Sequence, residues 1–190
     1  MQGQWPSLQG PHNLENAAAA VAIAEHLGVA PEIWREALKS FAGLPHRMER
    51  VGEFGGVLFV NDSKATNQAS TAPALAAFPP DPDPRIHWIV GGLPKEDGLG
   101  ECAQYLGNVA AAYTIGEAGP RFAEWLEPAV RVERCEMLCE AVQRAMAAAK
   151  PGDVVLLSPA CASFDQFLDY EKRGEHFRSM VLALNNSDAA

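Results

Sequence analysis

The sequence predicts an α/β fold with a mostly parallel sheet, helices on both faces and a β-hairpin at its start. The first observation is that two short apolar runs, Val57–Val60 and Val154–Leu157, each lead into small polar residues and then a helical pattern. The second is the sequence EFGG just before Val57, which favours a tight turn between two antiparallel strands. The third is the alternation of strand and helix patterns along the rest of the chain, which is typical of parallel sheets.

Residues 1–43 are expected to form a helical segment that precedes this fold. Apolar residues recur at helical spacing from Ala17 onward, and Gly28 suits the end of the first helix. Pro31 is expected to open a second helix, and Gly43 to end it. The boundary between the two parts is therefore predicted just after residue 43.

The remaining elements follow from the same patterns. The proline-rich segment Phe78–Arg85 can neither continue a helix nor join a sheet, so it is predicted to be a connector. The segment from Met137 to Met146 has an apolar helical stripe and is predicted to be core. Further strands are predicted near Met48–Glu53, at Ile86–Val90, at Val109–Ile115 and near Val130–Val132, with further helices at Gln68–Phe78, near Pro120–Leu126 and after Ser158.

Composition limits the classes of function. The chain has 190 residues, enough for one domain with its own core plus part of another. A net charge of -9 argues against a general nucleic-acid-binding surface. No apolar run is long enough to insert into a membrane, and the first residues do not resemble a signal peptide. The four cysteines form no CxxC pair, so reduced thiols and a cytoplasmic location are expected.

Polar residues follow the two strongest strand predictions. Ligands of open α/β sheets bind at the carboxyl ends of the strands, where Asp62, Ser63, Lys64, Thr66 and Asn67 would lie. An ordinary loop in which Asp62 or Ser63 caps the following helix would give the same pattern.

A second polar segment follows Leu157 and contains Ser158 and Ser163. Its small residues are expected to expose backbone N–H groups at a helix start, which would bind an anion. Lys95 follows a third strand and the pair Gly91–Gly92, where it is either a ligand contact or a solvated lysine beside Glu96.

Three motifs carry a resemblance: GLPHR at Gly43–Arg47, NDSKATN at Asn61–Asn67 and SPACASFDQF at Ser158–Phe167. In this order they resemble the C-terminal part of the Mur ligases, which form peptide bonds with ATP in bacterial cell-wall synthesis. The NDSKATN form is similar to that of the members that add D-glutamate. The resemblance implies a Rossmann-like amino-acid-binding domain at residues 44–190. Residues 1–43 would be the helical remnant of the central ATPase domain.

The resemblance also implies roles for individual residues. The implied ATP-binding residues are Asn13 and Asn16, next to His12, together with Arg47 and Asp62. The implied D-glutamate-binding residues are Thr66, Lys95, Ser163, Phe164 and Tyr170, with Lys64 as a further phosphate or substrate contact. No catalytic residue or metal ligand is assigned. Without the resemblance, one of the two asparagines would be a helix cap and Arg47 a surface arginine.

The implied reaction joins D-glutamate to UDP-N-acetylmuramoyl-L-alanine at the expense of ATP with Mg²⁺, through an acyl phosphate. No G-x-x-x-x-G-K-[ST] phosphate loop occurs in the sequence. The Mg²⁺ ligands and the nucleotide-sugar-binding domain are therefore expected in missing N-terminal and central domains, and the chain alone is expected to be inactive. The alternatives are a free-standing, non-catalytic module that binds a nucleotide or an acidic ligand, and a Mur-type ligase for another amino acid.

Overall fold

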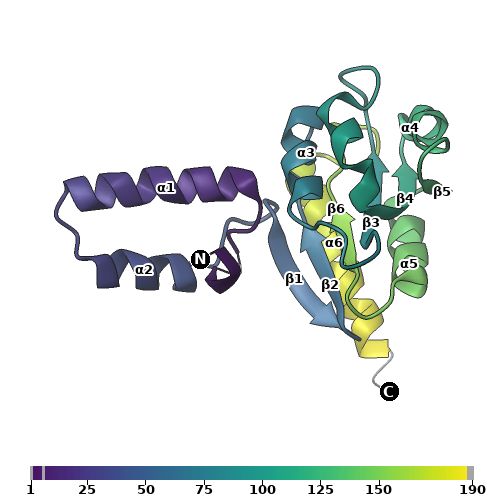
Figure 1. Cartoon of the computed structure of the whole chain (residues 1–190). Helices are drawn as coiled ribbons and strands as arrows, with labels where there is room; N and C mark the ends of the chain where they lie inside the picture. Colours follow the sequence, from purple (N-terminus) through teal and green to yellow (C-terminus); the bar gives the residue numbers. More distant parts are fainter. Residues whose placement is uncertain (1, 6, 188–190) are drawn as a thin grey trace.

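The computed structural model of the chain describes residues 2–5 and 7–187, which form a helical hairpin beside an α/β body (Figure 1). The hairpin comprises a short 3₁₀ helix η1 (Gln2–Gln4) and the helices α1 (Pro11–His26) and α2 (Pro31–Ser40). Its small core of Trp5, Leu8 and Ala17 is separate from the cores of the body.

The body is built on one six-stranded sheet with the order β1-β2-β6-β3-β4-β5. β1 pairs antiparallel with β2 through the turn at Gly55–Gly56, and every other pair is parallel. The predicted fold class is confirmed, including the initial hairpin. The strands are β1 (Glu49–Phe54), β2 (Val57–Asn61), β3 (Ile86–Gly91), β4 (Val109–Ile115), β5 (Arg131–Glu136) and β6 (Val154–Leu157).

Helices cover both faces of the sheet, as the sequence predicts. Successive strand residues point to opposite faces, so Trp88 packs with Phe122 on one side while Ile89 packs with Phe177 on the other. Burying each such side chain contributes about 1.5–3 kcal/mol. The first face carries α3 (Gln68–Ala76), the 3₁₀ segment η2 (Gly100–Asn108) and α4 (Gly119–Leu126), and the second carries α5 (Leu138–Ala148) and α6 (Tyr170–Ser187).

Several local expectations were wrong. The helix predicted after Ser158 begins later than its expected start among the small residues: residues 158–169 form a loop, and α6 begins only at Tyr170. The loop makes its own turn, because the Ser163 carbonyl accepts hydrogen bonds from the N–H groups of Gln166 and Phe167. Met137 precedes α5 and is 52% exposed, so it does not belong to the core. The segment η2 was not predicted, and β5 is longer than predicted.

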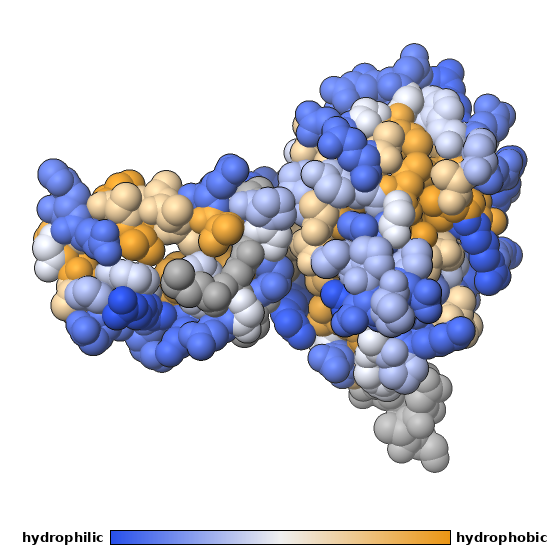
Figure 2. Space-filling view, in the orientation of Figure 1, coloured by the Kyte–Doolittle hydropathy of each residue, from blue (hydrophilic) through white to orange (hydrophobic). Residues whose placement is uncertain are grey.

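The helical hairpin exposes much apolar surface. Ile23, Leu27 and Ile33 are each more than 60% exposed, and apolar side chains are visible on this part of the molecule in Figure 2. α2 has no buried residue among those the structure describes. No helix in the described ranges has the length and apolarity needed to cross a membrane.

Candidate functional site

Asp62 lies where β2 ends, at the carboxyl edge of the parallel strands. Its backbone N–H donates to the Leu157 carbonyl at 2.7 Å, which continues the pairing with β6. The side chain is buried: Oδ1 accepts from the Met48 N–H at 3.1 Å, and Oδ2 accepts from the Ser158 hydroxyl at 2.7 Å. Burial raises the pKa of Asp62 to about 7, although these hydrogen bonds and the charge of Arg47 oppose the shift.

A pocket of about 320 Å³ opens beside this carboxylate. Two cations, Arg47 and Lys64, share it with Asp62, while the hydroxyl of Ser70 belongs to the first turn of α3. A carboxylate can accept hydrogen bonds from ligand hydroxyls, and the cations suit negatively charged groups. The full lining is Arg47, Met48, Asp62, Lys64, Ala65, Ser70, Pro73 and Ala74.

Lys95 and Thr66 meet at the same edge, with the lysine Nζ 3.1 Å from the threonine Oγ1. β3 ends at Gly91 and the loop that carries Lys95 begins at Gly92; their φ values of 125° and 133° disfavour residues with a side chain. A Cβ on Gly91 would lie 2.0 Å from the Ile115 carbonyl oxygen. The glycines therefore let this loop leave β3 in close contact with its neighbours.

The loop after β6 joins this group through the backbone. Leu93 and Ala162 form an isolated antiparallel bridge with N–H···O distances of 2.9 and 3.1 Å. Lys95 and Ser163 therefore lie on loops that are paired with each other, at one edge of the sheet. Ser163 is 1% exposed, and its hydroxyl has no hydrogen-bond partner among the described residues.

Lys64 and Tyr170 form a second contact between residues singled out in the sequence. The lysine Nζ lies 3.1 Å from the tyrosine hydroxyl and 4.3 Å from the ring centroid. The hydroxyl in turn donates to Glu171 at 3.0 Å. A cavity of about 500 Å³ adjoins this pair and shares Arg47 and Lys64 with the Asp62 pocket.

Six of the residues in the predicted site line neither cavity: Asn13, Asn16, Thr66, Lys95, Ser163 and Phe164. Asn13 is buried on α1 and donates to the Gln9 carbonyl at 2.9 Å, while Asn16 is exposed. Neither asparagine lines the two cavities, although α1 contacts α3. Phe164 is 68% exposed on the loop after β6. The structure thus brings together Asp62, Arg47 and Lys64 in one group and Thr66, Lys95 and the Ser163 loop in another.

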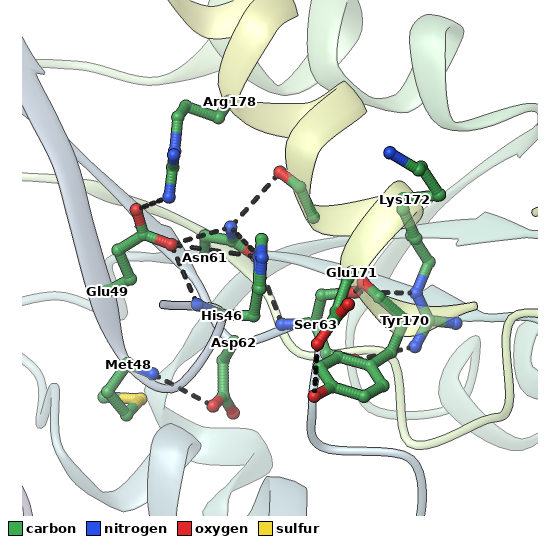
Figure 3. Close-up of polar contacts among 12 residues, drawn as sticks. His46, Met48, Glu49, Asn61, Asp62, Ser63, Tyr170, Glu171, Lys172 and Arg178 are labelled. Carbon is green, nitrogen blue, oxygen red and sulfur yellow. Dashed lines mark hydrogen bonds and ion pairs between the residues drawn. The ribbon is translucent and has the colours of Figure 1, made fainter. Parts of the chain in front are cut away.

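A buried polar network that the sequence analysis missed fixes the segment around Arg47 (Figure 3). Asn61 is its centre: its amide nitrogen lies 3.0 Å from Nδ1 of His46 and donates to Glu49 at 3.0 Å and to the Gly174 carbonyl at 3.2 Å. Glu49 also accepts from the His46 N–H and pairs with Arg178. The positions of Arg47 and Asp62 therefore depend on residues from β1, β2 and α6.

Gly174 leaves space for this network, which allows a test. A Cβ at this position would lie 2.2 Å from Nδ1 of His46. Glycine to alanine inside a helix ordinarily stabilises by about 1 kcal/mol. Here we expect Gly174→Ala to destabilise the chain by roughly 1–3 kcal/mol, because His46 must move. Urea unfolding measures the change, with Gly107→Ala as the control, since its added Cβ meets nothing within 4 Å. Stabilisation by Gly174→Ala would show that the network tolerates the extra atom.

Comparisons with known proteins identify the family. Residues 46–161 match the family model of the Mur ligase, glutamate ligase domain. Proteins named UDP-N-acetylmuramoylalanine--D-glutamate ligase are similar over nearly the whole chain. The one from Novosphingobium aromaticivorans is 71% identical over 96% of this chain and 40% of its own length. The one from Sphingopyxis alaskensis is 57% identical over 96% of this chain and 42% of its own length. The chain thus spans about two fifths of the length of these curated relatives.

Solved structures with low sequence identity share the fold. The UDP-N-acetylmuramate-alanine ligase MurC of Thermotoga maritima matches with a TM-score of 0.63 at 18% identity, over 92% of this chain and 38% of that one. A pseudomurein peptide ligase type C from Methanothermus fervidus matches with a TM-score of 0.62 at 20% identity, over 92% of this chain and 36% of that one. The family model covers more than half of the chain, and the predicted motifs lie at one edge of the matching fold. The chain therefore belongs to the Mur ligase family and contains its glutamate ligase domain.

Proposed function

We propose that this chain supplies the amino-acid-binding domain, and part of the ATP site, of a ligase that adds D-glutamate to UDP-N-acetylmuramoyl-L-alanine. The observation that carries the proposal is the meeting of Lys95 and Thr66, 3.1 Å apart, on loops at the sheet edge that also holds Asp62. D-Glutamate has two carboxylates, so a binding site needs a cation and neutral donors. The names of the relatives favour D-glutamate over other amino acids.

In the proposed nucleotide site, Asp62 accepts hydrogen bonds from the ATP ribose hydroxyls, and Arg47 binds the phosphates. Both residues line the 320 Å³ pocket. Lys64 lines the same pocket and contacts either a phosphate or the amino acid. Ser163, Phe164 and Tyr170 complete the proposed D-glutamate site through backbone and side-chain groups, and Asn13 and Asn16 approach the nucleotide only in the longer protein.

In the proposed reaction, the alanyl carboxylate attacks the γ-phosphate of ATP, which yields ADP and an acyl phosphate. The D-glutamate amine then attacks the acyl carbon, loses a proton and expels inorganic phosphate. The role of the protein in such a transfer is mainly positioning and charge stabilisation. Within the described ranges, no three His, Cys, Asp or Glu side chains are placed to bind a metal ion. The proposed Mg²⁺ ligands lie in the part of the relatives that this chain does not match.

The domain division follows the same proposal. Residues 1–43 would belong to the central ATPase domain and residues 44–190 to the amino-acid-binding domain. The separate core of the helical hairpin and its exposed apolar residues support this division. Because ATP and a nucleotide-linked sugar are the proposed substrates, the cytoplasm is the proposed compartment.

A chain that spans two fifths of its relatives should bind ligands without catalysing the reaction. We expect no phosphate release from ATP when this chain is incubated with Mg²⁺ and D-glutamate, because the sequence has no phosphate loop. A colorimetric phosphate assay measures this, with heat-denatured protein as the background. Turnover clearly above that background would contradict the proposal that this chain binds ligands without catalysing the reaction.

The second candidate function is a non-catalytic module that binds a nucleotide or an acidic ligand. The pocket with one carboxylate and two cations supports it as well. Joining this chain to the N-terminal part of the Novosphingobium aromaticivorans relative separates the two. If the chain is part of a ligase, the joined protein should add D-glutamate in an ATP-dependent reaction. If the chain is a binding module, the joined protein should show no such addition.

A further inference from the structure

Arg173 is a fully buried cation in the first turn of α6. Its side chain is 1% exposed. Nε donates to the Ser63 hydroxyl at 3.0 Å, and Nη2 donates to the Ser63 carbonyl at 2.8 Å. Nη1 and Nη2 both donate to the Cys161 carbonyl at 3.1 Å. The guanidinium thus binds the loop after β2 and the loop after β6 at the same time.

No carboxylate neutralises this charge by direct contact. Within the described part of the chain, Arg173 takes part in no ion pair with an N···O distance of 4.0 Å or less. Burial lowers the pKa of Arg173 to about 10, although the nearby charge of Asp165 opposes the shift, and the group stays protonated at neutral pH. A buried charge without a directly paired carboxylate is costly even when it is hydrogen-bonded, and neutral donors could satisfy the same oxygens at a lower cost. A negative ligand near this point would offset that cost.

The loops around Arg173 are those of the proposed binding site. Ser63 lies between Asp62 and Lys64, and its hydroxyl donates to the Tyr170 carbonyl at 2.7 Å. Cys161 lies two residues before Ser163. A third loop is close as well, because a Cβ on Gly92 would lie 3.2 Å from Nη1 of Arg173. Three strand-end loops therefore converge on one guanidinium.

Resting on the proposed function, we propose that Arg173 is a positioning residue for the amino-acid substrate. It holds the loops of Lys64, Lys95 and Ser163 in one arrangement, and its charge, which no carboxylate contacts directly, favours a second carboxylate on the ligand without touching it. The site should then discriminate between an amino acid with two carboxylates and its amide analogue.

Two variants separate charge from hydrogen bonding. Arg173→Lys keeps the charge but loses the planar fork that reaches both loops. Arg173→Gln loses the charge and keeps amide donors. Binding of D-glutamate and of D-glutamine to the unaltered chain and to both variants is measured by NMR titration. We expect Arg173→Gln to weaken D-glutamate binding at least tenfold and D-glutamine binding by less, which reduces the preference for D-glutamate. Arg173→Lys should weaken the binding of both ligands but keep the preference for D-glutamate.

Amide hydrogen exchange tests the positioning role without any ligand. The first probe is the N–H of Lys64, which donates to the His46 carbonyl. The other two are the N–H groups of Leu93 and Ala162, each of which donates to the carbonyl of the other residue. In Arg173→Lys these three should exchange at least tenfold faster. The N–H of Val154, bonded to Arg85 at the opposite edge, serves as the reference and should be unaffected. Equal acceleration of all four amides would mean that Arg173 is only structural.

The outcomes distinguish the two proposals. If the unaltered chain binds neither amino acid, the proposed function is contradicted, and the exchange data still decide the positioning role. If the chain binds D-glutamate but Arg173→Gln keeps the full preference over D-glutamine, the charge role is overturned. If Arg173→Gln does not fold, Arg173→Lys decides: unchanged affinities and unchanged exchange would overturn the inference.

Discussion

Replacing Lys95 with alanine is expected to weaken D-glutamate binding about ten- to a hundredfold. In the proposed site the lysine supplies a charge-assisted hydrogen bond to one carboxylate of D-glutamate, and losing such a bond costs roughly 1.5–3 kcal/mol. ATP binding should change little, because Lys95 does not line the pocket beside Asp62. Calorimetric or NMR titration of the chain with each ligand measures both effects.

Lys150→Ala is the matched control for this experiment. Lys150 is also exposed, but it lies before β6, at the edge of the sheet opposite the proposed site. It should leave both affinities unchanged. A loss of ATP affinity as large as the loss of D-glutamate affinity would mean that Lys95 binds a phosphate, and no loss of either would remove it from the site.

Replacing Asp62 with asparagine is expected to stabilise the chain at pH 8 by about 2–4 kcal/mol. The pKa of Asp62 rises from 3.8 to about 7 on folding, mainly through burial. Between these values the folded state keeps a proton that the unfolded state has lost, so stability falls as the pH rises through this range. The asparagine side chain has no charge to bury. Its amide can accept from the Met48 N–H and donate to the Ser158 hydroxyl, which can donate to Thr71.

Urea unfolding at pH 6 and pH 8 measures this effect. The advantage of Asp62→Asn should grow by about 1 kcal/mol between these pH values, as the remaining Asp62 proton of the folded state is lost. Asp83→Asn removes the same formal charge from an exposed position in the connector and should show no such growth. A variant that is less stable than the unaltered chain at pH 8 would indicate that the ionised carboxylate is favourable in the folded state.

The same variant should bind ATP about tenfold more weakly, since ribose hydroxyls bond more strongly to a carboxylate than to an amide. Greater stability with weaker binding distinguishes a ligand-binding carboxylate from one retained for packing. If Asp62→Asn gained stability and kept its ATP affinity, the ribose role would be refuted.

Asp62 and Arg173 share a physical property that explains why they stand out in the structure. Each buries an ionisable group at the edge of the sheet. Burial raises the pKa of Asp62 and lowers that of Arg173, which in both cases favours the neutral form. Such groups reduce the stability of a domain unless a ligand or a network compensates them. Their position beside the loops of Lys64, Lys95 and Ser163 fits a site that is completed by its ligands.

The sequence by itself determined the fold class, the hairpin and the edge of the sheet at which the motifs lie. These depend on local patterns: apolar runs of four to six residues, glycines at the turn and polar residues directly after strands. Asp62 could be placed because it follows β2 immediately, and Lys95 because it follows the two glycines at the end of β3.

Only the tertiary structure decided which of these residues meet and what holds them. Arg173 reaches Ser63 across 110 positions of sequence, and Asn61 reaches Gly174 across 113. No periodicity encodes such a pair, because each partner looks like an ordinary polar residue in its own segment. The same holds for the loop at residues 158–169, where the bridge to Leu93 and the bonds from Arg173 support an irregular path that local propensity did not predict.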